Sequence, residues 1–230
     1  MTLTERHHAF LSASFYRELT GRCPGNGEAT FVLATQRYGE QRGSRMAQRA
    51  IRDGRTLDFA TYKAYGEWSY TEEYFKAGKH MEVISTSPDL HYHVHACPWH
   101  DQYQAMGLIE GACVYCRHID LAISRGFNPF LVFEVRSTLH REDKCDFVLK
   151  DARLDEKGYT VDTAVAQMPF DYHCGHLWKT FCDVVASIHG DKGREINETV
   201  REAFALEYGD AAAEILGAYE DTDFNVLPRS

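Results

Sequence analysis

The sequence predicts an α+β fold: a helical N-terminal third, a central antiparallel sheet of short strands, and helices packed on that sheet. Three observations support this prediction. Apolar residues recur at helical spacing as far as residue 77, short runs rich in Val, Ile and Phe follow between residues 81 and 166, and helical spacing returns from residue 174. A group of strands with helices before and after it is typical of an antiparallel sheet covered by helices.

The first third is predicted to form three helices. Their apolar periodicity covers residues 3–19, a second stretch that ends at Asp53-Gly54, and residues 58–77. The second helix contains a basic run from Arg37 to Arg55, whose arginines alternate with apolar residues at helical spacing. This pattern is typical of a solvated helix face. The alternative is that one or two of these arginines bind an anion.

The rest of the chain is predicted to alternate between strands and helices. Strands are predicted at residues 81–86, 92–97, 130–136, 143–150 and 159–166, and a Pro88-Asp89 turn joins the first two into a hairpin. Helices are predicted at residues 99–125, with Gly126 as the stop signal, at 174–189 and at 193–216. We expect a single domain over residues 1–230, with a helical part at 1–80, a sheet with one central helix at 81–170 and a helical cover at 171–220.

Composition argues against several classes of protein. The formal net charge is -9, whereas nucleic-acid binding needs a clustered basic surface. The N-terminus lacks the apolar stretch of a signal peptide, no apolar run approaches membrane-spanning length, and no glycine-rich phosphate loop follows a strand. Seven cysteines in such a chain predict reduced thiols rather than a disulfide framework. We therefore expect a cytoplasmic protein without nucleic-acid or membrane partners.

The densest group of chemically active side chains is His91-x-His93-x-His95-x-Cys97. On a β-strand, whose side chains alternate between two faces, all four would share one face. Such a row could bind a metal ion or take part in catalysis. The alternative is a strand whose histidines simply face water.

A second group lies on the predicted helix that follows. Cys116 and Asp120 are four residues apart and therefore share one helix face, with Cys113 one turn earlier. A thiol beside a carboxylate suggests a nucleophile and a proton carrier, with His93 or His95 as the group that activates the thiol. The alternative is that the two cysteines are small core residues.

Metal binding is a further alternative for the same residues. Zinc could be bound by a set drawn from His93, His95, Cys97, Cys113, Cys116 and Cys145. No second C-x-x-C or regular H-x3-H pair completes a recognised zinc motif, so we expect no metal and no other cofactor. Redox chemistry is disfavoured because Cys113-Val114-Tyr115-Cys116 falls in the middle of a predicted helix.

Two residues after this helix complete the candidate site. Asn128, in Gly126-Phe127-Asn128-Pro129, could hold a polar group of a substrate, or it could only stabilise the turn. Cys145, on a predicted strand where it alternates with Phe147, is either a core thiol or a site thiol. His176, at the start of a later helix, is a secondary candidate.

Five short motifs follow one another along residues 30–148. They are Arg37-Tyr38-Gly39 with Arg42-Gly43 and Arg45-Met46-Ala47; Cys97-Pro98-Trp99; Tyr115-Cys116 with Ile119-Asp120; Gly126-Phe127-Asn128-Pro129; and Asp143 with Cys145 and Phe147. In this order and spacing the chain resembles the L-2-amino-thiazoline-4-carboxylic acid hydrolase family. The histidine row is denser than in the family pattern, and Glu142 stands where a glycine is usual.

The resemblance implies a cysteine-dependent hydrolase of a small cyclic amidine or isothiourea, of the kind used in bacterial metabolism leading to cysteine. It implies Cys116 as nucleophile, with Cys97 and Cys145 as rivals, Asp120 to bind the amidinium or transfer protons, and His93 or His95 to activate the thiol. Asn128, Trp99 and Tyr115 are then the substrate-binding candidates, and the partner is the heterocyclic substrate, with assembly into a homo-oligomer left open. The alternative function is a sensor module that binds a small ligand or metal with the same histidines and cysteines and does not turn it over.

Overall fold

The computed structural model of the chain describes residues 2–68, 81–155 and 167–228, and every statement below concerns these residues. They fall into two compact units, each assembled from separate stretches of sequence. A helical unit combines Met1–Tyr38, Pro98–Tyr115 and Pro169–Thr222, and a sheet unit combines Gly39–Cys97, Cys116–Met168 and Asp223–Ser230. The division falls within helices α2 (Gly27–Arg52) and α6 (Ile109–Phe127), so each unit contains part of both.

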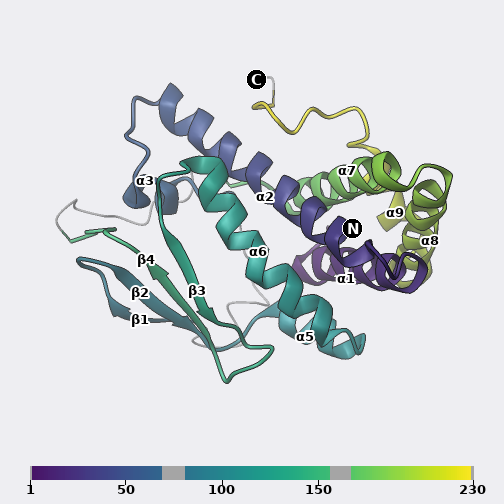
Figure 1. Cartoon of the computed structure of the whole chain (residues 1–230). Coiled ribbons are helices and arrows are strands. Elements are labelled where there is room, and N and C mark those ends of the chain that lie inside the picture. The colour runs from purple at the N-terminus through teal and green to yellow at the C-terminus, as the bar shows by residue number, and fades with distance from the viewer. Residues whose placement is uncertain (1, 69–80, 156–166, 229–230) are drawn as a thin grey trace. The chain divides into compact units, whose positions relative to one another are not determined.

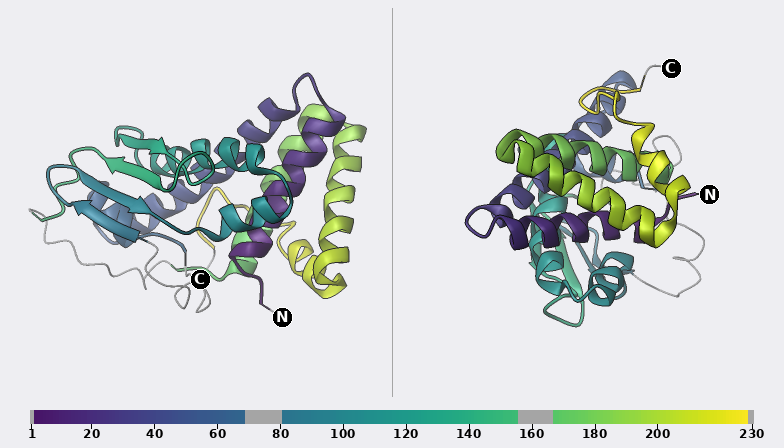
Figure 2. Two further views of the ribbon diagram at one scale, coloured as in Figure 1. Left: turned by 90° about the horizontal axis from the view of Figure 1, so that it is seen from below. Right: turned by 90° about the vertical axis from the view of Figure 1, so that its right-hand side faces the viewer.

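The helical unit is built around α1 (Glu5–Arg22), which packs against α5, α7 and α8. Figures 1 and 2 show α1 in purple beside α7 and α8 in green to yellow-green. The remaining elements of this unit are α5 (Pro98–Ala105), α7 (Phe170–His189), α8 (Asp191–Tyr208) and α9 (Asp210–Gly217). The side chains of Phe15, Phe31 and Phe181 are fully buried, and the Phe181 ring contacts the other two, which gives the unit an aromatic core.

Two predicted long helices are each divided in two. Residues 99–125 were predicted as one helix, but α5 and α6 are separated at Gly107, and residues 193–216 form α8 and α9, which are separated at Gly209. Both glycines have positive φ, +69° and +89°, a conformation that costs glycine little and ends a right-handed helix. The apolar periodicity continues across both breaks, which is why the sequence pattern did not reveal them.

The sheet unit contains an antiparallel sheet of four short strands in the order β1-β2-β4-β3 (Figure 1). They are β1 (Met81–Ser85), β2 (Leu90–Val94), β3 (Phe133–Ser137) and β4 (Cys145–Leu149), and α3 (Phe59–Ala64) also belongs to this unit. This sheet, together with the helices, confirms the predicted α+β class. The predicted strand at 159–166 and the end of the predicted helix at 58–77 lie outside the described residues.

The two faces of the sheet differ in character. Tyr92, Phe133 and Phe147 form a buried aromatic face, and their rings contact in sequence across β2, β4 and β3. His93 on β2 pairs with Asp146 on β4, and by the alternation of a strand both point to the opposite face. β2 ends at Val94, so the predicted four-residue row is wrong as a strand feature: His95 and Cys97 follow the strand.

Glycines allow α2 and α6 to approach closely inside the sheet unit. A Cβ atom on Gly43 would lie 2.0 Å from the Ile123 carbonyl oxygen, and one on Gly126 would lie 2.3 Å from that of Glu40. Any larger residue at either position would force the helix backbones apart. The glycines of the Arg42-Gly43 and Gly126-Phe127 motifs therefore have a packing role.

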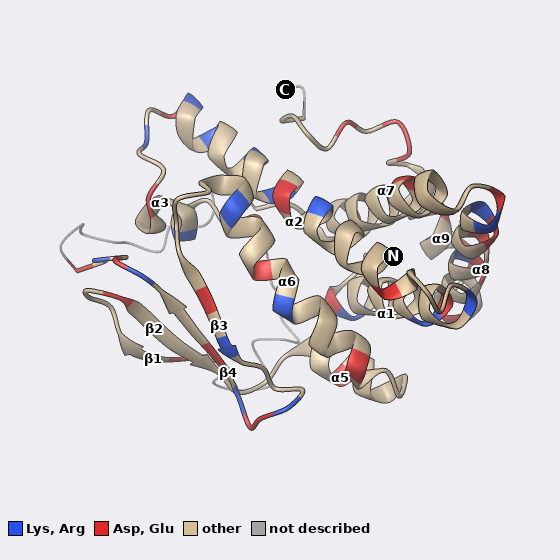
Figure 3. Ribbon diagram, in the orientation of Figure 1, with Lys and Arg blue, Asp and Glu red and all other residues tan. Residues whose placement is uncertain are grey.

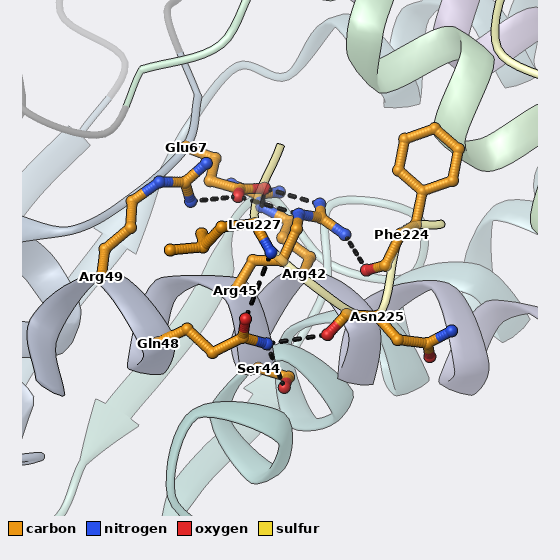
Figure 4. Close-up of polar contacts among 9 residues, drawn as sticks. All are labelled: Arg42, Ser44, Arg45, Gln48, Arg49, Glu67, Phe224, Asn225 and Leu227. Atoms are coloured by element: carbon orange, nitrogen blue, oxygen red, sulfur yellow. Dashed lines mark hydrogen bonds and ion pairs between the residues drawn. The ribbon is translucent and has the colours of Figure 1, made fainter. Parts of the chain in front are cut away.

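The basic run on α2 is not a solvated face throughout, which corrects the prediction. Arg42, Arg45 and Arg49 are buried, with exposed fractions of 3%, 0% and 6%, and surround the buried carboxylate of Glu67 (Figure 4). Burial of charge on this scale requires a paired counter-charge. That counter-charge lies 18 or more residues along the chain, so no local pattern indicates it.

On α8, acidic and basic residues are interspersed (Figure 3). No helix among the described residues combines the length and the apolar character needed to cross a membrane.

Candidate active site

The candidate site begins on α6, which presents Cys116 and Asp120 from one face because they are four residues apart. The half-buried Cys116 has its Sγ atom 3.2 Å from Nε2 of His140. His140 lies between β3 and β4, in the connection that brings the chain back along the sheet. A thiol in contact with an imidazole can transfer its proton to the ring, which is the arrangement that activates a cysteine nucleophile.

Asp120, one turn further along α6, is a carboxyl group in a desolvating environment. Burial raises its pKa from the ordinary value of 3.8 to about 6, and the positive charges of Arg42 and Lys63 offset only part of this rise. None of the described residues forms a hydrogen bond or an ion pair with this carboxylate. Asp120 can therefore change its charge near neutral pH, and its oxygens are available to a ligand.

Two cationic side chains act on Asp120 from other elements. Lys63 of α3 has its ammonium nitrogen 5.0 Å from the centre of the Tyr92 ring, and burial lowers its pKa while Asp120 opposes that shift. Within the described ranges Lys63 makes no hydrogen bond or ion pair. Arg42 lies 4.0 Å over the Trp68 ring, and its Nε and Nη1 atoms are buried without a hydrogen-bond partner. Both cations thus have donors available for an anion.

Of the two rival thiols, Cys97 is half-buried as Cys116 is, whereas Cys145 is buried. The pKa of Cys145 is raised to about 12, mainly by burial and to a smaller extent by the nearby Cys97 and Asp120, although the Leu139 backbone N–H, which donates to its Sγ atom at 3.3 Å, opposes this rise. Such a thiol stays protonated at neutral pH and is a weak nucleophile. Cys113 is buried and belongs to the helical unit.

The histidine row is not brought to Cys116. Val94 pairs with Cys145 on the buried face of the sheet, whereas His91 and His93 point to the opposite face. There the Nε2 atom of His91 lies 2.8 Å from Oδ1 of Asp146, and the Nε2 atom of His95 lies 3.2 Å from Oε2 of Glu82. The imidazole in contact with the Cys116 sulfur is His140.

The predicted substrate-binding residues are engaged in other contacts. The Asn128 side chain accepts from the Phe130 backbone N–H at 3.0 Å, which stabilises the turn, and donates to the distant Leu57 carbonyl at 2.7 Å, so both ends of the amide are engaged within the protein.

Trp99 and Tyr115 belong to the helical unit. Trp99 donates to the His8 ring at 3.2 Å, and the Tyr115 ring packs near Phe31. His176, the secondary candidate, is buried in the same unit with its ring centre 4.4 Å from that of Tyr38.

Three residues of the site were missed by the sequence analysis. His140 and Lys63 occur singly, in segments without a recognisable motif, and become site residues only through the fold. Arg42 lies in the basic run for which anion binding was the alternative interpretation, and its buried Nε and Nη1 atoms, which make no hydrogen bond, favour that alternative at this position.

Comparison with known proteins gives a family assignment. No curated protein and no solved structure matches the chain. The sequence profile of L-2-amino-thiazoline-4-carboxylic acid hydrolase matches residues 4–149, a span that includes Arg42, Lys63, Cys116, Asp120 and His140. Since this match covers more than half of the 230 residues, the chain belongs to the L-2-amino-thiazoline-4-carboxylic acid hydrolase family.

Proposed function

We propose that the protein is a cysteine-dependent hydrolase that opens the ring of 2-aminothiazoline-4-carboxylate or a closely similar cyclic amidine. The family supplies the hydrolase activity and the thiazoline ring. The observation that supports the thiol chemistry is the 3.2 Å contact between Cys116 and His140, one helical turn from Asp120. A nucleophile, its base and an ionisable carboxyl group are thus close together in the sheet unit.

The proposed reaction adds one water molecule to the ring. The Cys116 sulfur attacks the amidine carbon while His140 takes the thiol proton, which gives a tetrahedral adduct. The bond from that carbon to one ring heteroatom breaks, and the heteroatom leaves with the proton held by His140. Water then attacks the same carbon, the bond from carbon to the Cys116 sulfur breaks, and the sulfur regains a proton. The product is the opened ring and the enzyme returns to its starting state.

The charges around Asp120 fit a substrate with both a cation and an anion. A 2-aminothiazoline-4-carboxylate carries an amidinium group, which an ionised Asp120 would bind, and a carboxylate, which Lys63 and Arg42 would bind. Asp120 and Lys63 make no ion pair with each other, so the polar atoms of both side chains are available to a ligand. Binding to the carboxylate also favours the protonated form of the amidine, whose carbon is the better electrophile for Cys116.

The decisive experiment replaces the thiols one at a time. Cys116→Ala is expected to lower kcat at least about 1,000-fold, because no other group supplies the nucleophile, and His140→Gln is expected to lower it about 100- to 10,000-fold through loss of the base. Turnover of L-2-aminothiazoline-4-carboxylate is followed by the appearance of a free thiol, which signals cleavage of the ring C–S bond, and of a free primary α-amine, which signals cleavage of the ring C–N bond; ammonia would signal loss of the exocyclic nitrogen instead.

Cys113→Ala is the matched control, since Cys113 lies one turn from Cys116 on the same helix, and circular dichroism verifies the fold of each variant. Full activity in Cys116→Ala would refute the assignment of the nucleophile, and full activity in Cys97→Ala, Cys116→Ala and Cys145→Ala alike would refute thiol catalysis. Tight binding of the ring without turnover by the wild-type protein would show the sensor function instead.

The role of Lys63 has a separate test. Lys63→Met keeps the length of the side chain and removes its charge, so the variant is expected to raise KM for the carboxylate substrate about 10- to 100-fold, the loss typical of a charged hydrogen bond. The same variant should bind 2-aminothiazoline, which lacks the carboxylate, as the wild-type protein does. An equal loss for both compounds would show that Lys63 does not contact the carboxylate.

A further inference from the structure

The histidine row that the proposed reaction does not use forms a separate cluster with two carboxylates. His91 and His93 lie two residues apart on β2 and share one face of the sheet. Asp146 on β4 is directly opposite His93, and Glu82 on β1 is opposite His93 on the other side. Ligand atoms of His91, His93 and Asp146 all lie within 4.8 Å of one another.

The distances in this trio suit ligands of one ion. Two ligand atoms bound at about 2.0–2.1 Å to the same ion lie roughly 3 to 4 Å apart, depending on the angle between the bonds. Nε2 of His91 is 2.8 Å from Oδ1 of Asp146, and Nε2 of His93 is 4.0 Å from the same oxygen. Small rotations of side chains would bring all three atoms to a common centre.

The state of His93 indicates that this is more than a surface ion pair. Its side chain is only 12% exposed, yet its two ring nitrogens are 3.7 Å and 4.0 Å from the nearest carboxylate oxygens, too far for good hydrogen bonds. At these distances a cation can lie between the half-buried His93 ring and one of the two carboxylates. The backbones of β2 and β4 are joined by ladder pairing, so the three side chains start from a rigid base.

We propose that His91, His93 and Asp146 bind one divalent transition-metal ion of the Zn²⁺ type on the sheet face opposite Cys145. Two imidazole nitrogens and one carboxylate oxygen are a donor set typical of such ions, and they leave coordination positions for water. The ion joins β2 to β4 and is separate from the Cys116 chemistry, because the buried layer of the sheet lies between them.

Glu82 and His95 complete the surroundings of the ion. When Nε2 of His93 binds the metal, its Nδ1 faces Oε2 of Glu82 at 3.7 Å, and a carboxylate in that position orients a histidine ligand. Glu82, His93 and His95 form a second trio, but His95 follows the strand, and the side chains of His95 and Glu82 are 41% and 49% exposed. The trio with Asp146 is the less exposed of the two, and its three residues all lie on paired strands, so the ion is assigned there.

The test is a titration of the metal-free full chain with Zn²⁺ by calorimetry and with Co²⁺ by visible absorption. The wild-type protein is expected to bind one ion, and the Co²⁺ spectrum is expected to lack thiolate-to-metal charge-transfer bands. Asp146→Asn, which keeps the shape but loses the charge, should weaken binding by more than about 10-fold, and Glu82→Gln should weaken it about 10-fold. Asp143→Asn is the matched control, since it removes an equal charge from an exposed position three residues away and should leave affinity unchanged.

Each contrary result identifies a different failure. Equal affinities of Asp146→Asn and Asp143→Asn, or an absence of stoichiometric binding to the wild-type protein, would overturn the site. If His95→Gln loses binding and Asp146→Asn retains it, the ion is bound by the second trio instead. Thiolate-to-metal bands in the Co²⁺ spectrum would show that cysteines bind the ion. None of these outcomes depends on turnover of the thiazoline, so failure of the metal site and failure of the proposed hydrolase are distinguishable.

Discussion

At the scale of single residues, Asp120 links the electrostatics of the site to its chemistry. The carboxyl is desolvated enough for its pKa to rise to about 6 although Arg42 and Lys63 both favour its ionised form. A carboxyl group with this pKa can bind a cation when ionised and donate a proton when neutral, which are the two roles that an amidine substrate requires.

The raised pKa predicts how activity depends on pH. If ionised Asp120 binds the amidinium, kcat/KM of the wild-type protein should rise with pH through a midpoint near 6, and Asp120→Asn should be slow and lack this rise. Ionisation of the substrate is common to both proteins and cancels in the comparison. A midpoint near 6 that persists in Asp120→Asn would show that another group is responsible.

The same raised pKa predicts that stability depends on pH in the opposite direction to activity: the contribution of Asp120 to stability falls as the pH rises. The folded chain holds the Asp120 proton more tightly than the unfolded chain, so this contribution to stability is fully present below pH 3.8 and is lost as the pH rises through about 6. The free energy of unfolding of the wild-type protein, measured by urea denaturation between pH 4 and 7, should therefore fall relative to that of Asp120→Asn. Parallel curves for the two proteins would contradict the raised pKa.

The site residues that could be predicted from the sequence are those whose relative positions depend only on local geometry. Spacing of four on a helix places Cys116 and Asp120 on one face whatever the rest of the fold does. The contact of His140 with Cys116 depends instead on the path of the chain between β3 and β4, across 24 residues of sequence separation, and no periodicity reports it. Asn128 was ambiguous for a similar reason, since its partner Leu57 is 71 residues away.

At the scale of elements, hydrophobic periodicity predicted where helices and strands occur and was less informative about where they end. The break at Gly107 depends on a single backbone dihedral, and the apolar pattern continues across it. β2 ends at Val94 although alternation of side chains continues to Cys97, because the end of the strand is set by its pairing with β1 and β4. The histidine row was therefore correctly seen as a cluster and wrongly assigned to one strand.

At the scale of the whole molecule, each unit is assembled from stretches far apart in sequence, and the arginine cluster is a clear example. Arg45 of α2 binds Glu67 through Nε and Nη2 at 3.2 and 2.9 Å, and its Nη1 donates to the Phe224 carbonyl at 2.7 Å. Gln48 of the same helix donates to the Asn225 carbonyl and accepts from the Leu227 backbone N–H (Figure 4). One helix thus holds both the segment before β1 and the C-terminal segment of the sheet unit.

This arrangement predicts a large loss of stability when Glu67 is neutralised. Glu67→Gln would leave three buried guanidinium groups without their counter-charge, and removal of one partner of a buried ion pair typically costs about 3–5 kcal/mol. The free energy of unfolding should fall by that amount in denaturant titrations. Glu134→Gln is the matched control, because the Glu134–Arg136 pair is 40% and 48% exposed and such pairs contribute at most about 1 kcal/mol.

Equal small effects of the two substitutions would mean that water or an anion compensates the arginines. In that case added phosphate should stabilise Glu67→Gln more than it stabilises the wild-type protein, because an anion can replace the lost carboxylate.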